Sequence, residues 1–279
     1  MDRPLDNMRL STDKAILVIG MLCEGMSIRS IERLTGVNRN TVMNLLVLAG
    51  EKCDRLMRDR IKDVPVTDVK CDEIWGFVGC KQKTVTAGIC TDETFGDAYC
   101  FVGFERNSKM VLSWHLGRRT RDDTMAFMQK LDKATKGFFQ ITTDAFSAYW
   151  DAVVYYLGTC VSFAQLIKTY SSTTGQAEVR YSPGEVVEAV PVIRHGKPDP
   201  QKISTSHFER QNLNIRMAMR RMTRLTNAFS KKWENLYWAY ALYFAFYNFW
   251  RIHGTTRVTP AIEAGITDHV WSIQELLTA

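Results

Sequence analysis

The stretch VKCDEIWGFVGC at residues 69–80 places two acidic residues inside an apolar run that fits a buried strand. Asp72 lies in the middle of this run, next to Glu73. A second run, FFQITTD at residues 138–144, ends on Asp144 directly before a segment with helical character. A carboxylate within or at the end of a core strand is costly unless it is paired or bound to a metal. Asp72 and Asp144 are therefore candidates for one shared site.

Strand-like and helical segments surround these two runs. Segments rich in Val, Phe, Tyr and Cys predict strands, with tight breaks typical of antiparallel hairpins, at residues 69–78, 85–90, 98–104 and 110–115. We expect a helix at 120–135, a strand at 138–143, a helix at 145–157 and a strand at 160–167. Strands followed by helix, strand, helix and strand form a mixed α/β order. This is the order of an RNase H-like core of the retroviral integrase type, in which the first and fourth strands are neighbours, so Asp72 and Asp144 are predicted to be adjacent.

Residues 11–50 have a helical pattern in three pieces. Thr12 or Asp13 can cap the first piece, Ser27 can cap the second, and Asn38 opens the third after a break at Gly36. Two helices, a short turn with glycine and a third helix outline a helix-turn-helix module. In the third piece the polar residues expected to face outward and to contact bases in the major groove are Arg39, Asn40 and Asn44. The alternative is a small three-helix bundle used for dimerisation.

The remaining pattern divides the chain into three parts. We predict a helix-turn-helix module at residues 1–62, a catalytic domain at 63–253 and a C-terminal tail at 254–279. Four of the seven prolines fall within residues 169–204, which predicts a long loop insertion in the catalytic domain. Helix is expected from about Ser206 to about His253, with a break around Ser230. The stretch WENLYWAYALYFAFYNFW at residues 233–250 is rich in Trp and Tyr and carries Glu and Asn, which favours a core helix over a membrane span.

Charge and cysteine content narrow the class of protein. The net charge is +6, and residues 202–232 hold eight Lys or Arg against one Glu, so this single segment carries the whole positive excess. Such a segment is typical of a phosphate-facing surface. The seven cysteines form no C-x-x-C pair, which favours reduced thiols over a zinc ribbon or a disulfide framework. The N-terminal MDRPLDNMRL has no apolar signal region, so we expect a cytoplasmic protein.

A third acidic residue, Glu209, lies within that basic segment. In HFERQNLNIRMAMRRMTRL, residues 207–225, helical spacing forms an apolar stripe that would anchor the helix to a sheet: Phe208, Ile215, Met219 and Met222. At about 100° per residue, the adjacent face carries polar and charged groups that could meet both a metal and DNA: Glu209, Asn212, Arg216 and Arg220.

Each acidic residue also has an ordinary structural explanation. Asp144 before a helix fits an N-cap, and Asp72 beside Glu73 fits a solvated strand edge. Glu209 fits half of an intrahelical ion pair with a neighbouring arginine, or a simple solvated acid. Taken together in this order of strands and helices, Asp72, Asp144 and Glu209 favour a site for two divalent ions, Mg²⁺ or Mn²⁺, which prefer carboxylate, water and phosphate oxygens. Such a site serves phosphoryl transfer.

Three motifs resemble the insertion-sequence-1 family of bacterial DDE transposases. They are DEIWGFVG at residues 72–79, TTDAFSAY at 142–149 and SHFERQNLNIRMAMRRMTRLTNAFSK at 206–231. The likeness runs from about residue 71 to the C-terminus, and YNFWRIHGTTRVTPAIEAGI at 247–266 is similar to the tail of insertion-sequence transposases. Unlike many members, this chain has no cysteine pairs for a zinc ribbon, and Ala145 follows Asp144 where the family often has glycine.

The resemblance implies a metal-dependent enzyme that nicks the ends of a mobile element and joins them to target DNA. It makes Asp72, Asp144 and Glu209 the acidic triad, with Asn212 and Arg216 as supporting residues. The partners it implies are double-stranded DNA, as inverted-repeat ends and target, and further copies of the chain. A catalytically silent DNA-binding regulator and a hydrolytic nuclease of the RNase H type are the alternatives.

Overall fold

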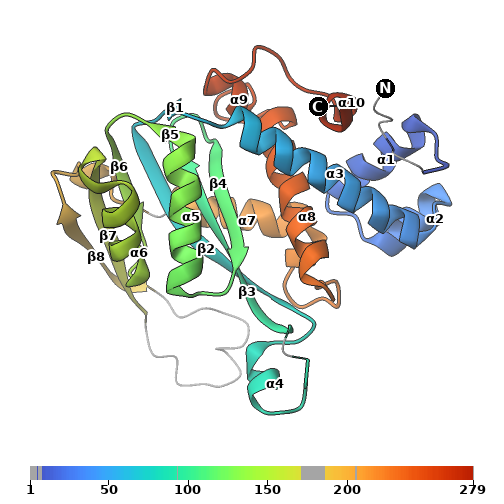
Figure 1. Ribbon diagram of the computed structural model, residues 1–279, viewed down its shortest axis with the longest axis horizontal. Coiled ribbons are helices and arrows are strands. Elements are labelled where there is room, and N and C mark those ends of the chain that lie inside the picture. The colour runs from blue at the N-terminus through green and yellow to red at the C-terminus, as the bar shows by residue number, and fades with distance from the viewer. Residues whose placement is uncertain (1–4, 6–7, 93, 171–185, 205, 279) are drawn as a thin grey trace.

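A mixed six-stranded sheet forms the centre of the molecule in the computed structural model (Figure 1). The model describes residues 5, 8–92, 94–170, 186–204 and 206–278, except for the side chains of residues 206–208. The strand order is β4-β3-β2-β6-β7-β8. The bounds are β2 Asp68–Val78, β3 Gly96–Glu105, β4 Val111–Gly117, β6 Phe139–Thr143, β7 Val161–Tyr170 and β8 Val186–His195. A separate short pair joins β1 Val64–Pro65 to β5 Thr135–Lys136.

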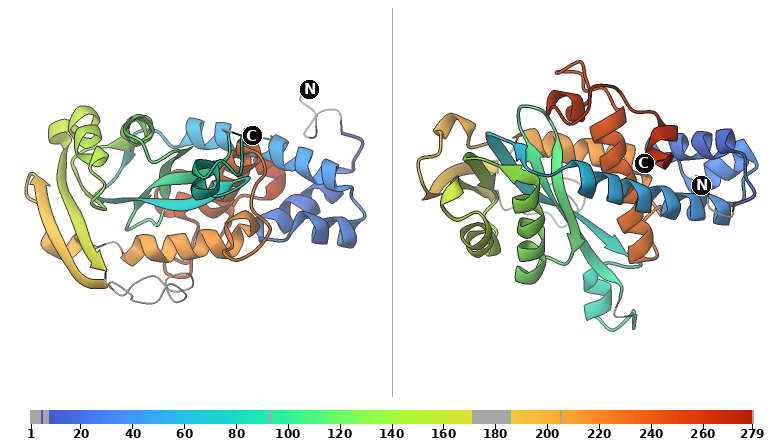
Figure 2. Two further views of the ribbon diagram at one scale, coloured as in Figure 1. Left: turned by 90° about the horizontal axis from the view of Figure 1, so that it is seen from below. Right: turned by 45° about the horizontal axis from the view of Figure 1, so that its top comes forward.

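Pairing within the sheet changes from antiparallel to parallel at β2. Strands β2, β3 and β4 form an antiparallel meander, whereas β6 is parallel to β2, β7 is parallel to β6, and β8 is antiparallel to β7. Two helices, α5 (Arg121–Ala134) and α6 (Ala148–Tyr156), cover one face of the sheet, and α7 (Ser206–Ala218) covers the other (Figure 2). The predicted mixed α/β architecture is confirmed.

The N-terminal helices have the caps that local chemistry favours. Helix α1 (Thr12–Cys23) begins after Ser11, whose hydroxyl accepts from Lys14 N, so the predicted capping by Thr12 or Asp13 is wrong. Helix α2 (Ile28–Thr35) is capped by Ser27 and ends at Gly36, which is left-handed with φ 68°. Helix α3 (Arg39–Arg60) is capped by Asn38.

Helix α3 crosses α8 (Trp233–Ala245), which continues as a π-helical segment at Phe246–Trp250. The two helices approach so closely that a Cβ on Gly50 would lie 2.6 Å from Trp238 Cβ, which only glycine avoids. At the far end, Asn248 binds both backbone groups of Val111 on β4, at 3.0 and 2.8 Å. The aromatic stretch is therefore a core helix, as predicted. None of the helices in the described ranges has the length and apolar character needed to cross a bilayer.

Three predicted segments differ from the structure. Residues 85–90 are not a strand: α4 (Gln82–Thr86) and an exposed turn lie there, and Ile89 is exposed and not packed against a sheet. Part of the predicted loop at 169–204 is the edge strand β8, which tolerates Pro191 because an edge strand has unpaired N–H positions. The helix expected to run on from Ser206 stops at Ala218.

Short helical turns complete the chain. They are η1 (Gly158–Cys160), η2 (Pro200–Lys202), η3 (Arg220–Met222), α9 (Pro260–Glu263) and α10 (Ile273–Thr278). Side-chain hydrogen bonds hold the turn where α7 ends: the Thr223 hydroxyl donates to Arg216 O of the last turn, and Arg216 donates to Met222 O of η3, each at 3.1 Å. The predicted apolar stripe is present at Ile215 and Met219, which are buried, whereas the side chain of Phe208 lies outside the described residues.

Candidate metal centre and nucleic-acid cleft

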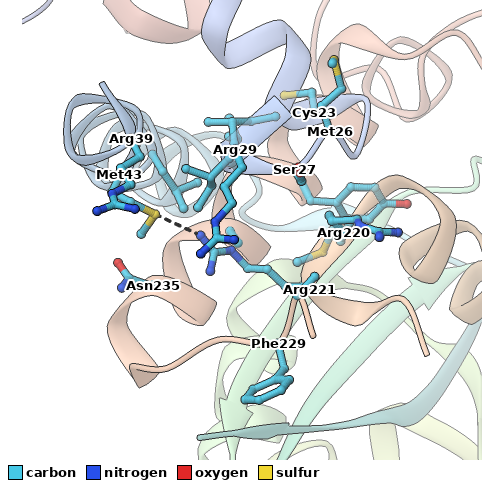
Figure 3. Close-up of a pocket in the computed structure, with 18 of the residues that line it drawn as sticks. Cys23, Met26, Ser27, Arg29, Arg39, Met43, Arg220, Arg221, Phe229 and Asn235 are labelled. Atoms are coloured by element: carbon cyan, nitrogen blue, oxygen red, sulfur yellow. Dashed lines mark hydrogen bonds between the residues drawn. The ribbon is translucent and has the colours of Figure 1, made fainter. Parts of the chain in front are cut away.

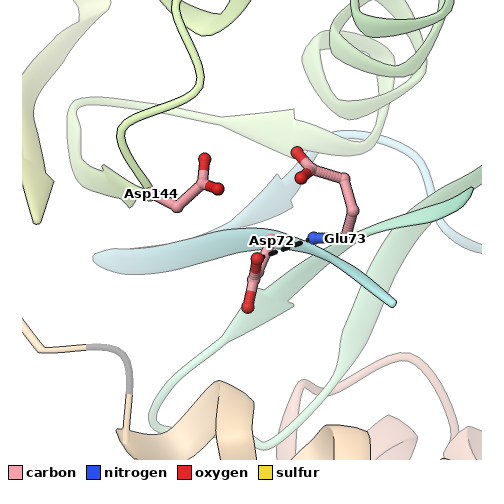
Figure 4. Close-up of side chains that lie close together, drawn as sticks. All are labelled: Asp72, Glu73 and Asp144. Atoms are coloured by element: carbon pink, nitrogen blue, oxygen red, sulfur yellow. Dashed lines mark hydrogen bonds between the residues drawn. The ribbon is translucent and has the colours of Figure 1, made fainter. Parts of the chain in front are cut away.

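Asp72 and Asp144 lie side by side on neighbouring parallel strands. Strands β2 and β6 pair Lys70 with Thr142, so Asp72 and Asp144 stand at the same level two residues further along. Together with Glu73 they offer three carboxylate oxygens that all lie within 4.8 Å of one another. Figure 4 shows Asp72 and Glu73 projecting to opposite sides of β2 while Asp144 approaches from the loop after β6. The adjacency expected from the order of strands and helices is therefore present.

The carboxylate of Asp144 is not the N-cap of the following helix. Its Oδ1 accepts from Phe146 N at 3.0 Å, and α6 begins only at Ala148. Its Oδ2 accepts from Arg119 Nη2 at 2.8 Å. The same guanidinium donates from Nε to Glu73 Oε2 at 3.1 Å, so Arg119 bridges two of the three acids. Arg119 is the counter-ion of the cluster on the side of Glu73.

Burial and mutual repulsion raise the pKa values of two of these acids. Burial first, and then the charge of Asp144, raise the pKa of Glu73 to about 7. Burial, Glu73 and Asp144 raise the pKa of Asp72 well above its usual range. Glu73 Oε1 is buried and has no hydrogen-bond partner in the described structure. A divalent cation would relieve both the repulsion and the unpaired oxygen, and an all-oxygen donor set is the one that Mg²⁺ and Mn²⁺ prefer, so the residues present fit such an ion.

Glu209 is not part of this group of three oxygens. Its carboxylate forms an ion pair with Lys168 of β7, rather than the intrahelical pair considered from the sequence. The Lys168 ammonium is in turn near enough to Asp72 to favour the charged form of that carboxylate. Glu209 is thus connected to the cluster through one lysine side chain. Glu73, Arg119 and Lys168 were not identified as site residues from the sequence; the GRRTR run at residues 117–121 was the available signal for Arg119.

The predicted companions of Glu209 have different environments. Asn212 Oδ1 is buried and has no hydrogen-bond partner in the part of the chain that the structure describes. The guanidinium of Arg216 donates to two backbone carbonyls, Met222 O and Trp75 O, each at 3.1 Å. Arg216 therefore joins α7 to β2. Arg220 lies beyond the end of α7, on the turn η3.

Arg220 shares a cleft with two of the residues predicted to read DNA. This cleft of about 790 Å³ separates the N-terminal helices from η3 and α8, and Arg39 and Asn40 line it (Figure 3). Its other basic residues are Arg29, Arg221 and Lys231, and none of the described residues that line it is acidic. Asn44 is exposed on α3 but does not line the cleft. Three of the predicted DNA contacts are therefore brought together, and Asn44 lies outside.

Comparisons with known proteins add little to this geometry. No protein-family model and no curated protein sequence matches the chain. Among solved structures, a piggyBac transposase in a synaptic complex with hairpin DNA is similar, with a TM-score of 0.41 and 10% identity, over 97% of this chain and 70% of that one. A likeness this weak does not establish a shared fold, so the functional proposal depends on the site itself.

The raised pKa of Glu73 predicts how stability depends on pH without metal. Between its ordinary value of 4.5 and about 7, the folded chain holds a proton that the unfolded chain has released. The free energy of unfolding in EDTA should therefore fall as pH rises through this window, by on the order of 3 kcal/mol. Urea unfolding at several pH values measures this fall in the free energy of unfolding. Glu73→Gln should flatten the pH dependence. Glu51→Gln, at an exposed position, should leave it unchanged. A parallel fall in wild type and Glu73→Gln would contradict the prediction.

Proposed function

We propose that this chain is a DDE-type DNA transposase that performs metal-dependent nicking and strand transfer on the ends of an insertion element. Its RNase H-like domain, residues 63–253, would hold two divalent ions, Mg²⁺ or Mn²⁺, on Asp72, Asp144 and Glu209. The observation that carries the proposal is the placement of Asp72 and Asp144 at one level of adjacent parallel strands, in a cluster that also holds Glu73. The strand order, with an antiparallel meander next to two parallel strands, supports the RNase H-like assignment.

Each residue of the proposed site has a physical task. Asp72 and Asp144 supply fixed oxygen ligands because both sit on or directly after core strands. Lys168 pairs with Glu209 and also acts on the charge of Asp72, and the Glu209 side chain is 60% exposed, so its carboxylate is open to an incoming cation. Arg119 orients Glu73 and Asp144 from the other side. When bound, divalent ions would activate the attacking oxygen and stabilise the leaving one.

The N-terminal part supplies DNA recognition in this proposal. We infer that residues 1–62 form a helix-turn-helix module whose exposed Arg39, Asn40 and Asn44 contact the inverted repeats. The cleft shared with Arg220 supports this assignment, because five basic residues line it, with no acid among its described lining residues, and such a surface favours phosphates. Synapsis of two ends would require further copies of the chain on DNA, and residues 254–279 form the C-terminal tail.

A cleavage assay tests this function directly. We expect the purified chain to nick a supercoiled plasmid that carries the DNA flanking its own gene, in the presence of Mg²⁺ or Mn²⁺ and not in EDTA. Joined products on an added target fragment should accumulate with time. Binding without nicking under either metal would instead identify a silent DNA-binding regulator, and nicking without joined products would identify a hydrolytic nuclease.

A further inference from the structure

A second cavity lies beside α7, between the β3–β4 turn and the chain that follows the π-helical segment. It has a volume of about 420 Å³, and among the described residues its lining holds no acidic side chain. Besides Phe104 and Ile252, the lining is basic and polar: Lys109, Arg210, Gln211, Asn214, Tyr247, Arg251, His253 and Thr255. None of its four basic residues forms an ion pair in the described structure. The ammonium of Lys109 also donates to the backbone carbonyl of Arg106. A concave site with several cations attracts anions.

Two buried polar groups in this cavity have no partner. Gln211 and Tyr247 are each only 2% exposed, and neither Gln211 Nε2 nor the Tyr247 hydroxyl has a hydrogen-bond partner among the described residues. Leaving a buried donor unpaired is costly, and native proteins seldom do so without a bound group to satisfy it. Both side chains line the cavity, which indicates a ligand rich in acceptor oxygens.

The remaining groups also present donors. His253 Nδ1 accepts from Thr255 N at 3.2 Å, so the neutral ring carries its proton on Nε2. Burial, and then the charges of Lys109 and Arg251, lower the pKa of His253, which shows that these cations lie close together. A tetrahedral oxyanion would accept from such donors and offset the repulsion between the cations.

The cavity opens on the same face of the sheet as Asp72. Strands β2 and β3 pair Asp72 with Val102 and Lys70 with Phe104, and Phe104 lines the cavity. Residues two apart on a strand share a face, so Phe104 and Asp72 point to the side that α7 covers. Arg210 and Gln211, which line the cavity, directly follow Glu209 on α7.

We propose that this cavity is a binding site for a phosphate group, held by Arg251, Lys109 and the unpaired donors of Gln211 and Tyr247. Its position on the Asp72 face favours a phosphodiester of a bound nucleic-acid strand as the source, and a free phosphate is the other source with the same chemistry. The choice of a phosphodiester rests on the proposed function, whereas the phosphate site itself rests only on the lining cations and the two unpaired donors.

The first arm of the test uses inorganic phosphate. Millimolar phosphate, compared with sodium chloride at equal ionic strength, should raise the melting temperature of the full chain by roughly 3 °C. Arg251→Gln and Gln211→Leu should lose this rise, whereas Arg55→Gln, which removes the same charge from an exposed position of α3, should keep it. Without phosphate, Gln211→Leu should melt no lower than wild type because the amide has no partner to lose. The site would be overturned if phosphate still raised the melting temperature of both Arg251→Gln and Gln211→Leu. It would also be overturned if phosphate did not raise the melting temperature of wild type and Arg251→Gln had no effect on DNA binding.

The second arm identifies the source of the phosphate. If a nucleic-acid strand supplies it, Arg251→Gln should weaken binding of a labelled random duplex by about tenfold relative to Arg55→Gln. The slope of log affinity against log salt should also decrease by about one. A phosphate response without any effect on duplex binding assigns the site to free phosphate. Failure of nicking in the plasmid assay would refute the proposed transposase and leave both arms interpretable.

Discussion

Replacing Asp144 with asparagine is expected to reduce metal-dependent nicking by about 10³-fold or more. The substitution keeps the shape of the side chain but removes one of the negative charges that would hold the cations. Such ions contribute several kcal/mol of charge stabilisation in the transition state, and each 1.4 kcal/mol is a factor of ten in rate. The measurement is the rate of nicking of the plasmid with flanking DNA at saturating Mg²⁺. Asp72→Asn should have an equal effect.

Asp151→Asn is a matched control for this loss. Asp151 lies on α6, seven residues after Asp144, and its side chain is 51% exposed in an ion pair with Arg121. Its substitution should leave nicking within about twofold of wild type, because exposed ion pairs of this kind contribute little. Nicking by Asp144→Asn within tenfold of wild type would rule out its role as a metal ligand.

The identity of the third acid separates two arrangements of the site. We expect Glu209→Gln to lose as much activity as Asp144→Asn, and Glu73→Gln to lose less than tenfold because Arg119 already pairs with Glu73. The opposite order would make Glu73 the third ligand, in keeping with the three oxygens that lie within 4.8 Å of one another. Thermal melts with Mn²⁺ give a readout without DNA, since the variant that lacks a true ligand should lose the metal-dependent rise in melting temperature.

Local chemistry explains why some of the fold could be predicted from the sequence. The caps at Ser27 and Asn38 and the left-handed Gly36 depend on neighbouring residues alone, so the bounds of α2 and the start of α3 followed from the pattern. The adjacency of Asp72 and Asp144 followed from the order of strands and helices, and the observed register places both at one level.

Features set by tertiary contacts could not be predicted in the same way. Nothing in the helical sequence around Met219 signals that α7 ends there, because the hydrogen bonds of Thr223 to Arg216 O and of Arg216 to Met222 O form only in the folded chain. The pairing of Glu209 with Lys168 joins residues 41 positions apart on different elements. The role of Glu73 likewise depends on its burial against Asp144, which the dipeptide Asp-Glu alone does not reveal.

The start of β2 contains a buried ion pair. Breaking it should lower the free energy of unfolding by more than the pH-dependent fall assigned to Glu73. Lys70 Nζ lies 2.7 Å from Asp68 Oδ1, and the two side chains are only 2% and 1% exposed. Asp68→Asn would leave the ammonium buried with only neutral partners, Thr142 Oγ1 at 3.1 Å and the carbonyl of Lys202. Breaking one side of a buried pair typically costs about 3–5 kcal/mol. Urea unfolding at neutral pH should show a loss of this size in Asp68→Asn.

Two further measurements distinguish this electrostatic cost from a general packing defect. The double variant Asp68→Asn/Lys70→Met should recover a large part of the lost stability, because the buried ammonium is gone. Arg106, which also contacts Asp68 at 3.4 Å, is 33% exposed and keeps water around its charge. Burial lowers the pKa of Lys70 in the native chain, and loss of Asp68 removes the interaction that opposes this shift. At pH values below the ordinary lysine pKa, folded Asp68→Asn then binds fewer protons than the unfolded chain. Its free energy of unfolding should therefore rise toward that of wild type as pH increases. A deficit that is independent of pH and remains in the double variant would show that Asp68 acts through packing.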